Sequence, residues 1–515
     1  MQSGNNNIER PVALVILDGW GYAPKTDGNA IAVAHTPNYD EICRSFPMTT
    51  LTAAASGTGC SPEMAGDPEV GHLHMGTGRA AVTETTRIAN AITSGEFMSN
   101  AVLIRAFEKA REKGSDVHLI GMISDAGIHS STNSLFALLR MAKAMGSKNV
   151  FIHGILDGLD VQPRTADVYT EALEIKLADI GVGRIATLCG RFFAMDAGEH
   201  WERTARAFTM LVHAEGERAN DPVSAIRNSF LRGISDEFIA PIVIEESADT
   251  PVARIKNGDL VVFFNHRADG MRQIVRSLCI PEGESGAKPD VDTVCLTEYD
   301  RAFNLPVAFR QDPERNTLAS VLSESELPIL KVTEQARVQH LTSCFDGGVD
   351  EQNHHEERVF IAGSERIVDI FPESGSFKIT DKLLRGIEAF HRGVNIANLP
   401  AAALMAETGN LERTREAIQY IDTCIGGIYD KVKQAGGVLL ITSSYGTCEE
   451  MVHSGSDEPN FAPTANPVPF HYIDFSENGV RLREDGLLAD VAPTILGVLG
   501  IEKPKEMTGE DLRIL

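Results

Sequence analysis

The chain has 515 residues and a formal net charge of −25, because 72 acidic side chains outnumber 47 basic ones. A surface this acidic repels phosphate backbones and anionic lipids, which excludes nucleic acid and membranes as general partners. No window approaches the roughly 18 uninterrupted apolar residues of a membrane span. The first ten residues are polar and the eight cysteines form no CxxC pair, so we expect reduced thiols and a cytoplasmic location.

Predicted strands and helices alternate along the chain. Strands are predicted at residues 12–17, 117–124, 149–156, 183–188, 259–265, 393–398 and 436–442. Helices are predicted at residues 36–46, 131–145, 165–180, 201–214, 269–279, 412–434 and 488–499. Strands that alternate with helices of about ten or more residues build parallel, doubly wound sheets with helices on both faces. The expected fold class is therefore α/β.

The length predicts more than one domain, because single cores stop growing near about 250–300 residues. Two connections rich in Gly or Pro are candidate boundaries, at residues 75–81 and 303–316. If both are hinges, the middle of the chain is inserted into a domain built from both chain ends. We therefore expect one domain from residues 1–80 and 311–515, and a second from residues 81–310.

Polar residues follow several predicted strands, where ligands of open α/β sheets bind. In chain order the segments are LDGWG (17–21), SDAGIHS (124–130), LDGLDVQP (156–163), GRFFAMD (190–196), FFNHRAD (263–269), TSSYG (442–446) and TANPVPF (464–470), to which EVGHLHMGTGR (69–79) and the C-terminal VAPTILGVLG and EMTG are added. Each motif alone is weak, but the ordered set resembles the cofactor-independent phosphoglycerate mutases of the alkaline phosphatase superfamily. The resemblance runs from about Pro11 to Leu512.

The resemblance implies a phosphatase-like domain built from both chain ends and an inserted, transferase-like substrate domain. It also implies an activity, the glycolytic interconversion of 3- and 2-phosphoglycerate. In that family a serine activated by two manganese-like divalent ions takes the phosphoryl group, and arginines hold the glycerate while it is phosphorylated again.

The position of the family's nucleophile differs in this sequence. The family motif GNSEVGH reads GDPEVGH here, so Pro68 stands where the serine is expected. Proline has no hydroxyl group and no backbone N–H, so it cannot attack phosphorus. The neighbouring Asp67 is a weak candidate for accepting a phosphoryl group, a reaction that needs a bound cation to offset the charge.

Most of the family's metal-ligand positions differ as well. Asp18 in LDGWG is the one ligand position that matches. The family's Asp-His pair is replaced by Ser444 and Tyr445, and another histidine is replaced by Pro463. A further Asp and His are missing from residues 399–407, where Glu407 is the only acidic residue. Adjacent divalent ions need several anionic ligands, so we expect the manganese site to be lost and no cofactor to be required.

The substrate positions of the family are half retained. Four residues match them: His129, Asp160, Arg191 and Arg267. Four family cations are replaced by uncharged residues: Leu159, Ala197, Gly270 and Gln335. Several guanidinium groups normally hold a small dianion through charge-assisted hydrogen bonds. The expected ligand is therefore a small carboxylate or phosphate anion that carries less charge than phosphoglycerate.

Structural interpretations of these residues stay open. Asp18 also suits a helix cap or a loop carboxylate. His72 and His129 follow glycine-rich turns and suit hydrogen-bonded loop histidines. Arg191 and Arg267 suit ties between strands and loops.

Three functions remain open, so enzyme status is not decided by the sequence. The leading hypothesis is a catalytically silent mutase-like protein, a pseudoenzyme, that binds a metabolite or an unidentified protein partner. The second is an enzyme of altered chemistry on a small phosphorylated or carboxylated substrate, using Asp18, Asp67 and His129. The third is a working phosphoglycerate mutase. Metal content separates them, since two tightly bound ions favour the third hypothesis and one weakly bound ion favours the second.

Overall fold

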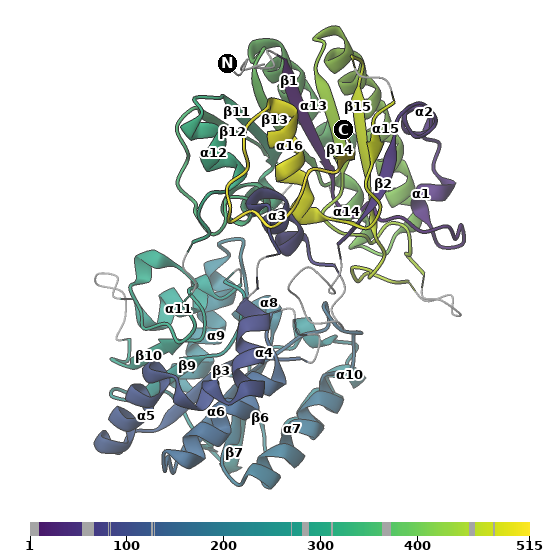
Figure 1. Cartoon of the computed structure of the whole chain (residues 1–515). Coiled ribbons are helices and arrows are strands. Elements are labelled where there is room, and N and C mark those ends of the chain that lie inside the picture. The colour runs from purple at the N-terminus through teal and green to yellow at the C-terminus, as the bar shows by residue number, and fades with distance from the viewer. Residues whose placement is uncertain are drawn as a thin grey trace. The chain divides into compact units, whose positions relative to one another are not determined.

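The computed structural model describes residues 10–53, 66–80, 82, 84–124, 127, 129–268, 270–280, 288–310, 313–362, 372–452, 459–476 and 479–514. The chain forms two compact units (Figure 1): Met1–Thr83 with Asp312–Leu515, called unit 1, and Glu84–Gln311, called unit 2. No helix in the described ranges is long and apolar enough to cross a membrane. The phosphatase-like and substrate roles expected for residues 1–80 with 311–515 and for residues 81–310 remain predictions.

Unit 1 contains an eight-stranded sheet with the order β12-β11-β13-β1-β14-β15-β2-β17. In that order its strands are Glu356–Ile361, Ile329–Glu334, Gly393–Leu399, Pro11–Leu17, Val438–Thr442, Val468–Asp474, Met48–Thr52 and Gly486–Leu487. β1 pairs in parallel with β13 and β14, whereas β15 is antiparallel to β14 and β2. All seven residues of β1 are buried, as expected for a central strand that is covered on both faces.

Helices cover both faces of this sheet (Figure 1). They are α1 Ala30–Val33, α2 Pro37–Ser45, α3 Pro68–Thr77, α12 Leu318–Glu324, α13 Pro372–Ala389, α14 Ala401–Ala406, α15 Leu411–Gln434 and α16 Val491–Leu499. Successive side chains of a strand point to opposite faces. The odd-numbered residues 13–17 of β1 therefore pack with α13, α14 and α15, and the even-numbered residues 12–16 pack with α12 and α16. A small ribbon joins β16 Arg481–Leu482 to β18 Arg513–Ile514.

Unit 2 contains a second sheet with the order β10-β9-β3-β4-β5-β7-β6, and β8 pairs with β7. In that order the strands are Asp292–Cys295, Leu260–Phe263, Val117–Ile123, Val150–Leu156, Arg184–Gly190, Ile242–Ser247, Glu217–Ala219 and Thr250–Pro251. β9, β3, β4 and β5 are parallel, so their carboxyl ends meet at one edge of the sheet.

The helices of unit 2 lie on both faces of its sheet. They are α4 Glu84–Ser94, α5 Ala101–Lys113, α6 Thr132–Ala144, α7 Ala166–Ile180, α8 Arg191–Ala194, α9 Trp201–His213, α10 Pro222–Leu231 and α11 Arg272–Cys279. Leu119 and Ile123 of β3 face the core formed with α4, α5, α6 and α7. Ile120 and Met122 face the core formed with α9 and α11.

The α/β class is confirmed, and each strand and helix predicted from the sequence is present within a few residues. Most neighbouring strands are parallel as expected, but β15 runs antiparallel to β14 and β7 runs antiparallel to β5. A parallel neighbour needs a crossover across the sheet face, usually a helix. Residues 443–452 and 459–467, described between β14 and β15, contain no helix, so this connection brings the chain back in the opposite direction.

Candidate functional site

Asp18 directly follows β1 and is fully buried at the carboxyl edge of the unit 1 sheet. Its hydrogen-bond partners come from the ends of β13 and β14, the strands that pair with β1. Asn398 Nδ2 donates to Asp18 Oδ2 at 2.9 Å, and Ser444 Oγ donates to Oδ1 at 2.6 Å. Ligands of α/β sheets bind at this edge. Asp18 therefore combines the expected position with a fixed orientation.

Two buried histidines face the carboxylate of Asp18. His72 Nε2 lies 3.8 Å from Oδ1 and His340 Nδ1 lies 3.8 Å from Oδ2, which is too long for a hydrogen bond. His72 Nδ1 lies 2.7 Å from the carbonyl oxygen of Pro68, so Nδ1 carries the proton and Nε2 keeps its lone pair. Neither facing nitrogen has a hydrogen-bond partner among the described residues. Such an unsatisfied buried group costs about 1–3 kcal/mol.

The protonation states at this cluster follow from burial and neighbouring charge. Burial lowers the pKa of His72 and lowers the pKa of His340 to about 4, so both rings are neutral near pH 7. Burial opposes ionisation of Asp18, but His72, His340 and Arg337 outweigh it and hold the pKa of Asp18 well below its ordinary value. One carboxylate and two neutral imidazoles are the forms in which these side chains bind metal ions.

Asp18, His72 and His340 form a candidate metal group. The three ligand atoms all lie within 4.8 Å of one another, and all three side chains are buried. His340 begins a single π-helical turn, His340–Cys344, which follows β11 after a short 3₁₀ turn. π-turns occur frequently at functional sites because they redirect side chains. The turn brings His340 toward the end of β1.

Three other oxygen-bearing residues at or near the family's ligand positions, Glu407, Ser444 and Tyr445, have different roles. Glu407 pairs with the guanidinium group of Arg337. Tyr445 is buried, and burial raises the pKa of its phenol well above the ordinary value, so it is neutral. Ser444 donates its hydroxyl hydrogen to Asp18. These contacts give Glu407 and Ser444 specific partners within the protein.

Pro68 and Asp67 form the start of helix α3. Pro68 is the first helical residue, where a missing N–H has no cost and the fixed φ of proline suits the helix. Asp67 is the N-cap, and its Oδ1 accepts from the backbone N–H of Glu69 at 2.8 Å and of Val70 at 3.1 Å. A cap of this kind is a sufficient structural reason for an aspartate. These contacts lend no support to Asp67 as a phosphoryl acceptor.

Three of the predicted substrate residues meet in unit 2. Arg191 begins α8 directly after β5, and its Nη2 lies 2.9 Å from His129 Nε2. Arg191 Nη1 lies 3.0 Å from Asp160 Oδ2 and 2.9 Å from Asp157 Oδ1. Ser124 Oγ donates to Asp157 Oδ2 at 2.7 Å. The ends of β3, β4 and β5 thus supply one connected cluster, called the Arg191 cluster.

The Arg191 cluster is less basic than the sequence motifs indicate. Two carboxylates, Asp157 and Asp160, share the single guanidinium group of Arg191. The fourth predicted residue, Arg267, is half-buried in the segment after β9. Its neighbour His266 donates its backbone N–H to the carbonyl oxygen of His129 at 2.7 Å, so this segment is joined to the cluster through the backbone.

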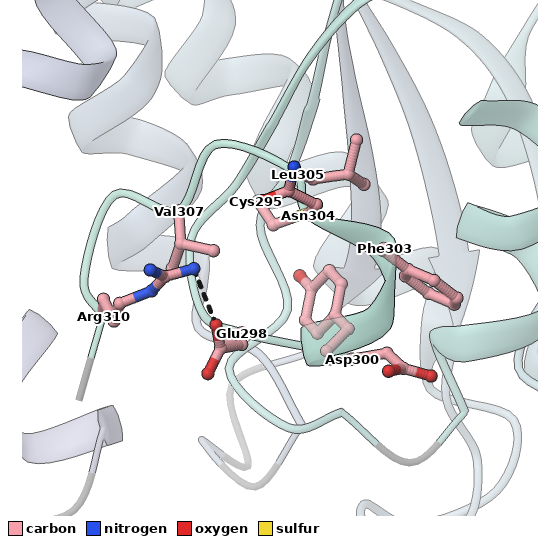
Figure 2. A pocket seen from close by; sticks show the side chains of 9 residues that line it. Cys295, Glu298, Asp300, Phe303, Asn304, Leu305, Val307 and Arg310 are labelled. Atoms are coloured by element: carbon pink, nitrogen blue, oxygen red, sulfur yellow. Dashed lines mark ion pairs between the residues drawn. The ribbon is translucent and has the colours of Figure 1, made fainter. Parts of the chain in front are cut away.

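A small pocket in unit 2 involves none of the predicted site residues. Figure 2 shows the side chains that line it, with Glu298 and Arg310 joined by an ion pair. Arg310 Nη2 lies 2.8 Å from Glu298 Oε1. Arg301 Nε lies 3.1 Å from the other oxygen, Oε2, so one carboxylate serves two guanidinium groups.

Residues 88–301 match the family model described as BPG-independent PGAM N-terminus. A 2,3-bisphosphoglycerate-independent phosphoglycerate mutase from Clostridium perfringens is 39% identical over 97% of this chain and 98% of that protein. Another from Desulforudis audaxviator is 41% identical over 98% of this chain and 99% of that protein. The chain belongs to the 2,3-bisphosphoglycerate-independent phosphoglycerate mutase family. The resemblance drawn from the motifs is confirmed.

A solved structure of Leishmania mexicana phosphoglycerate mutase, described at low cobalt concentration, agrees with this family assignment. It matches with a TM-score of 0.89 and 25% identity, and the match covers 99% of each chain. The fold expected from the resemblance is therefore confirmed.

The prediction that no cofactor is required is wrong. The full-length relatives are 2,3-bisphosphoglycerate-independent phosphoglycerate mutases, a family that uses divalent metal ions. The described residues also contain a metal-type group, formed by Asp18, His72 and His340. The prediction was based on the family's own ligand positions alone. The fold also brings His72 and His340 to Asp18, and neither residue occupies one of those positions.

The residues present do not fit the two-ion centre that the resemblance implies. At four of its positions the chain has Pro68, Ser444, Tyr445 and Pro463, none of which is a carboxylate or an imidazole. Ser444 already donates to Asp18, and the phenol of Tyr445 is neutral. These four positions therefore do not supply the anionic ligands that a pair of divalent ions needs.

Sequence reasoning missed three residues of these clusters: Asp157, Arg337 and His340. Asp157 lies directly after β4 in the motif LDGLD, and its position at a strand end was a usable signal. His340 and Arg337 follow β11 in the same segment as Gln335, which stands where the family has a cation. His340 approaches Asp18 through the π-turn, which has no sequence signature, and Arg337 lies in the 3₁₀ turn that precedes it.

Proposed function

We propose that this phosphoglycerate-mutase-like protein does not transfer a phosphoryl group through residue 68, and that its retained role is to bind a small anionic metabolite. The observation that carries the proposal is Pro68, which stands at the nucleophile position of the family motif and begins α3. A ring without a hydroxyl group cannot form the phosphoryl-enzyme that the family reaction requires. Neither Pro68 nor the capping oxygen of Asp67 offers a substitute.

The arrangement around Asp18 supports the same proposal. Its two oxygens accept hydrogen bonds from Ser444 and Asn398. Helix α14, Ala401–Ala406, is built from buried apolar residues in the segment where the family carries two further ligands. Serine-based transfer needs a Lewis acid beside the serine. In this chain both the serine position and most of the metal-ligand positions carry other residues.

A binding role is supported by the Arg191 cluster in unit 2. Arg191, His129 and Asp160 lie at the carboxyl ends of parallel strands, the edge at which α/β folds bind ligands. A guanidinium group can hold a carboxylate or phosphate through two parallel hydrogen bonds. Because Asp157 and Asp160 already share Arg191, we expect weak binding of a singly charged anion.

A second candidate function is a working phosphoglycerate mutase. The identity of 39–41% with proteins named as such mutases, over almost the whole chain, favours it. A coupled assay of 3-phosphoglycerate conversion separates the two candidates, with manganese or cobalt added and the Clostridium perfringens mutase as the positive control. We expect no turnover above an empty-vector preparation. Turnover that rises with metal and disappears with a chelator would establish the second candidate.

Anion binding is tested by calorimetric titration of glycerate and of 3-phosphoglycerate at matched salt. We expect weak glycerate binding that falls by at least roughly tenfold in Arg267→Ala, since one charge-assisted hydrogen bond contributes about 1.5–3 kcal/mol. Arg232→Ala is the matched control, because Arg232 pairs with Glu217 on the surface of the same unit. Micromolar 3-phosphoglycerate binding that Arg267→Ala leaves unchanged would contradict this binding site.

A further inference from the structure

The two unpartnered nitrogens beside Asp18 point to an ion rather than to hydrogen bonding. His72 Nε2 and His340 Nδ1 are buried, unpartnered among the described residues, and face opposite oxygens of one carboxylate. We propose that Asp18, His72 and His340 bind a single divalent transition-metal ion. Two of these three ligands lie outside the ligand positions that the family resemblance implies, so the site is distinct from a two-ion centre.

The distances fit a shared ion. Each histidine nitrogen lies 3.8 Å from an Asp18 oxygen. Ligand atoms held at about 2.0–2.2 Å by one tetrahedral ion lie roughly 3.3–3.5 Å from each other. All three ligand atoms lie within 4.8 Å of one another, so side-chain shifts of about 1 Å would close them around an ion.

The surrounding contacts hold each ligand in place. His72 Nδ1 donates to the carbonyl oxygen of Pro68 at 2.7 Å, which fixes the tautomer that leaves Nε2 available. Ser444 and Asn398 each donate to one oxygen of Asp18, and each oxygen keeps a lone pair for an ion. Hydrogen bonds of this kind orient metal ligands in known sites.

The charge at the cluster permits one ion. Arg337 is the cation that acts on Asp18, and its guanidinium group is paired with Glu407. Asp18 therefore contributes one uncompensated negative charge, and burial keeps both histidines neutral near pH 7. Two imidazoles and one carboxylate favour zinc-like ions such as Zn²⁺ and Co²⁺. Mg²⁺ and Ca²⁺ prefer sites made of oxygen atoms.

Metal analysis of the full-length protein tests the site. The protein is loaded with Zn²⁺, desalted and assayed for bound metal, and Co²⁺ loading is followed by visible absorption. The variants are His72→Gln and His340→Gln. The control is His471→Gln. His471 is also fully buried and its Nδ1 has no partner among the described residues. Its other nitrogen, Nε2, lies 3.0 Å from the hydroxyl oxygen of Tyr39.

We expect one Zn²⁺ per chain in the wild type and in His471→Gln, and less than a tenth of that in both site variants. If a site variant does not fold, the melting temperature of the wild type shows whether Zn²⁺ binds. An ion that binds only the folded state raises this temperature. We expect this temperature to rise with Zn²⁺ and to stay constant with Mg²⁺. The site is disproved if the wild type retains no Zn²⁺ or binds two ions per chain. It is also disproved if Zn²⁺ does not raise the melting temperature of the wild type, or if folded site variants retain as much Zn²⁺ as the wild type.

Discussion

At the scale of single residues, the centre of unit 1 is organised around one buried carboxylate. Asp18 accepts from Ser444 and Asn398 and faces His72 and His340. Pro68 takes part through its carbonyl oxygen, which accepts from His72. The side chain that would act as the nucleophile is missing, while the backbone of the same residue orients a histidine. Residue 68 therefore has a structural role in the cluster.

The variant Pro68→Ser tests whether the missing hydroxyl group alone accounts for a lack of transfer. We expect no gain in 3-phosphoglycerate conversion over the wild type, because a serine hydroxyl without its pair of metal ions is a near-neutral, weak nucleophile. The measurement is the coupled assay with added manganese.

Pro68→Ala is the matched control for this test, since it removes the ring without adding a hydroxyl group. Equal signals from the serine and alanine variants agree with the account. Conversion in Pro68→Ser at a substantial fraction of the rate of the Clostridium perfringens mutase would mean that this chain assembles an activating metal centre.

At the scale of elements, the sequence predicts what depends on local pattern. β1, β4 and α7 are apolar or amphipathic over their full length, and their predicted bounds differ from the structure by one residue or little more. α3 was not predicted, since its sequence PEVGHLHMGT contains two glycines and no clear apolar stripe. The direction of β15 depends on a long connection without a helix. Neither feature can be read from hydrophobic periodicity.

The candidate sites were likewise predicted where local sequence pattern determines them and missed where the three-dimensional fold determines them. The sequence placed Asp18, Asp160 and Arg191 at strand ends, and the structure puts each of them at the carboxyl edge of its own sheet. It did not find His340, because a π-turn rather than a motif brings this residue to Asp18. It also did not include Asp157, which directly follows β4 and adds a second carboxylate partner to Arg191.

At the scale of the whole molecule, the chain retains the fold of the family, and we propose that the chemistry of its centre differs. The match to the Leishmania mexicana enzyme covers 99% of both chains with a TM-score of 0.89. A fold does not determine function, because function depends on the groups at the site. Here the sheets, the helices on both faces and the strand-end positions remain, and the groups at residues 68, 444, 445 and 463 differ from those of the family motif.

The most direct test of the account is the intact mass of the protein after incubation with 3-phosphoglycerate and manganese, followed by acid quenching. The Clostridium perfringens mutase, treated in parallel, serves as the reference. The account predicts that this chain keeps its unmodified mass, because Pro68 cannot accept a phosphoryl group and Asp67 acts as a helix cap. A substrate-dependent gain of one phosphoryl group, mapped by peptide analysis to any residue of the chain, would contradict it.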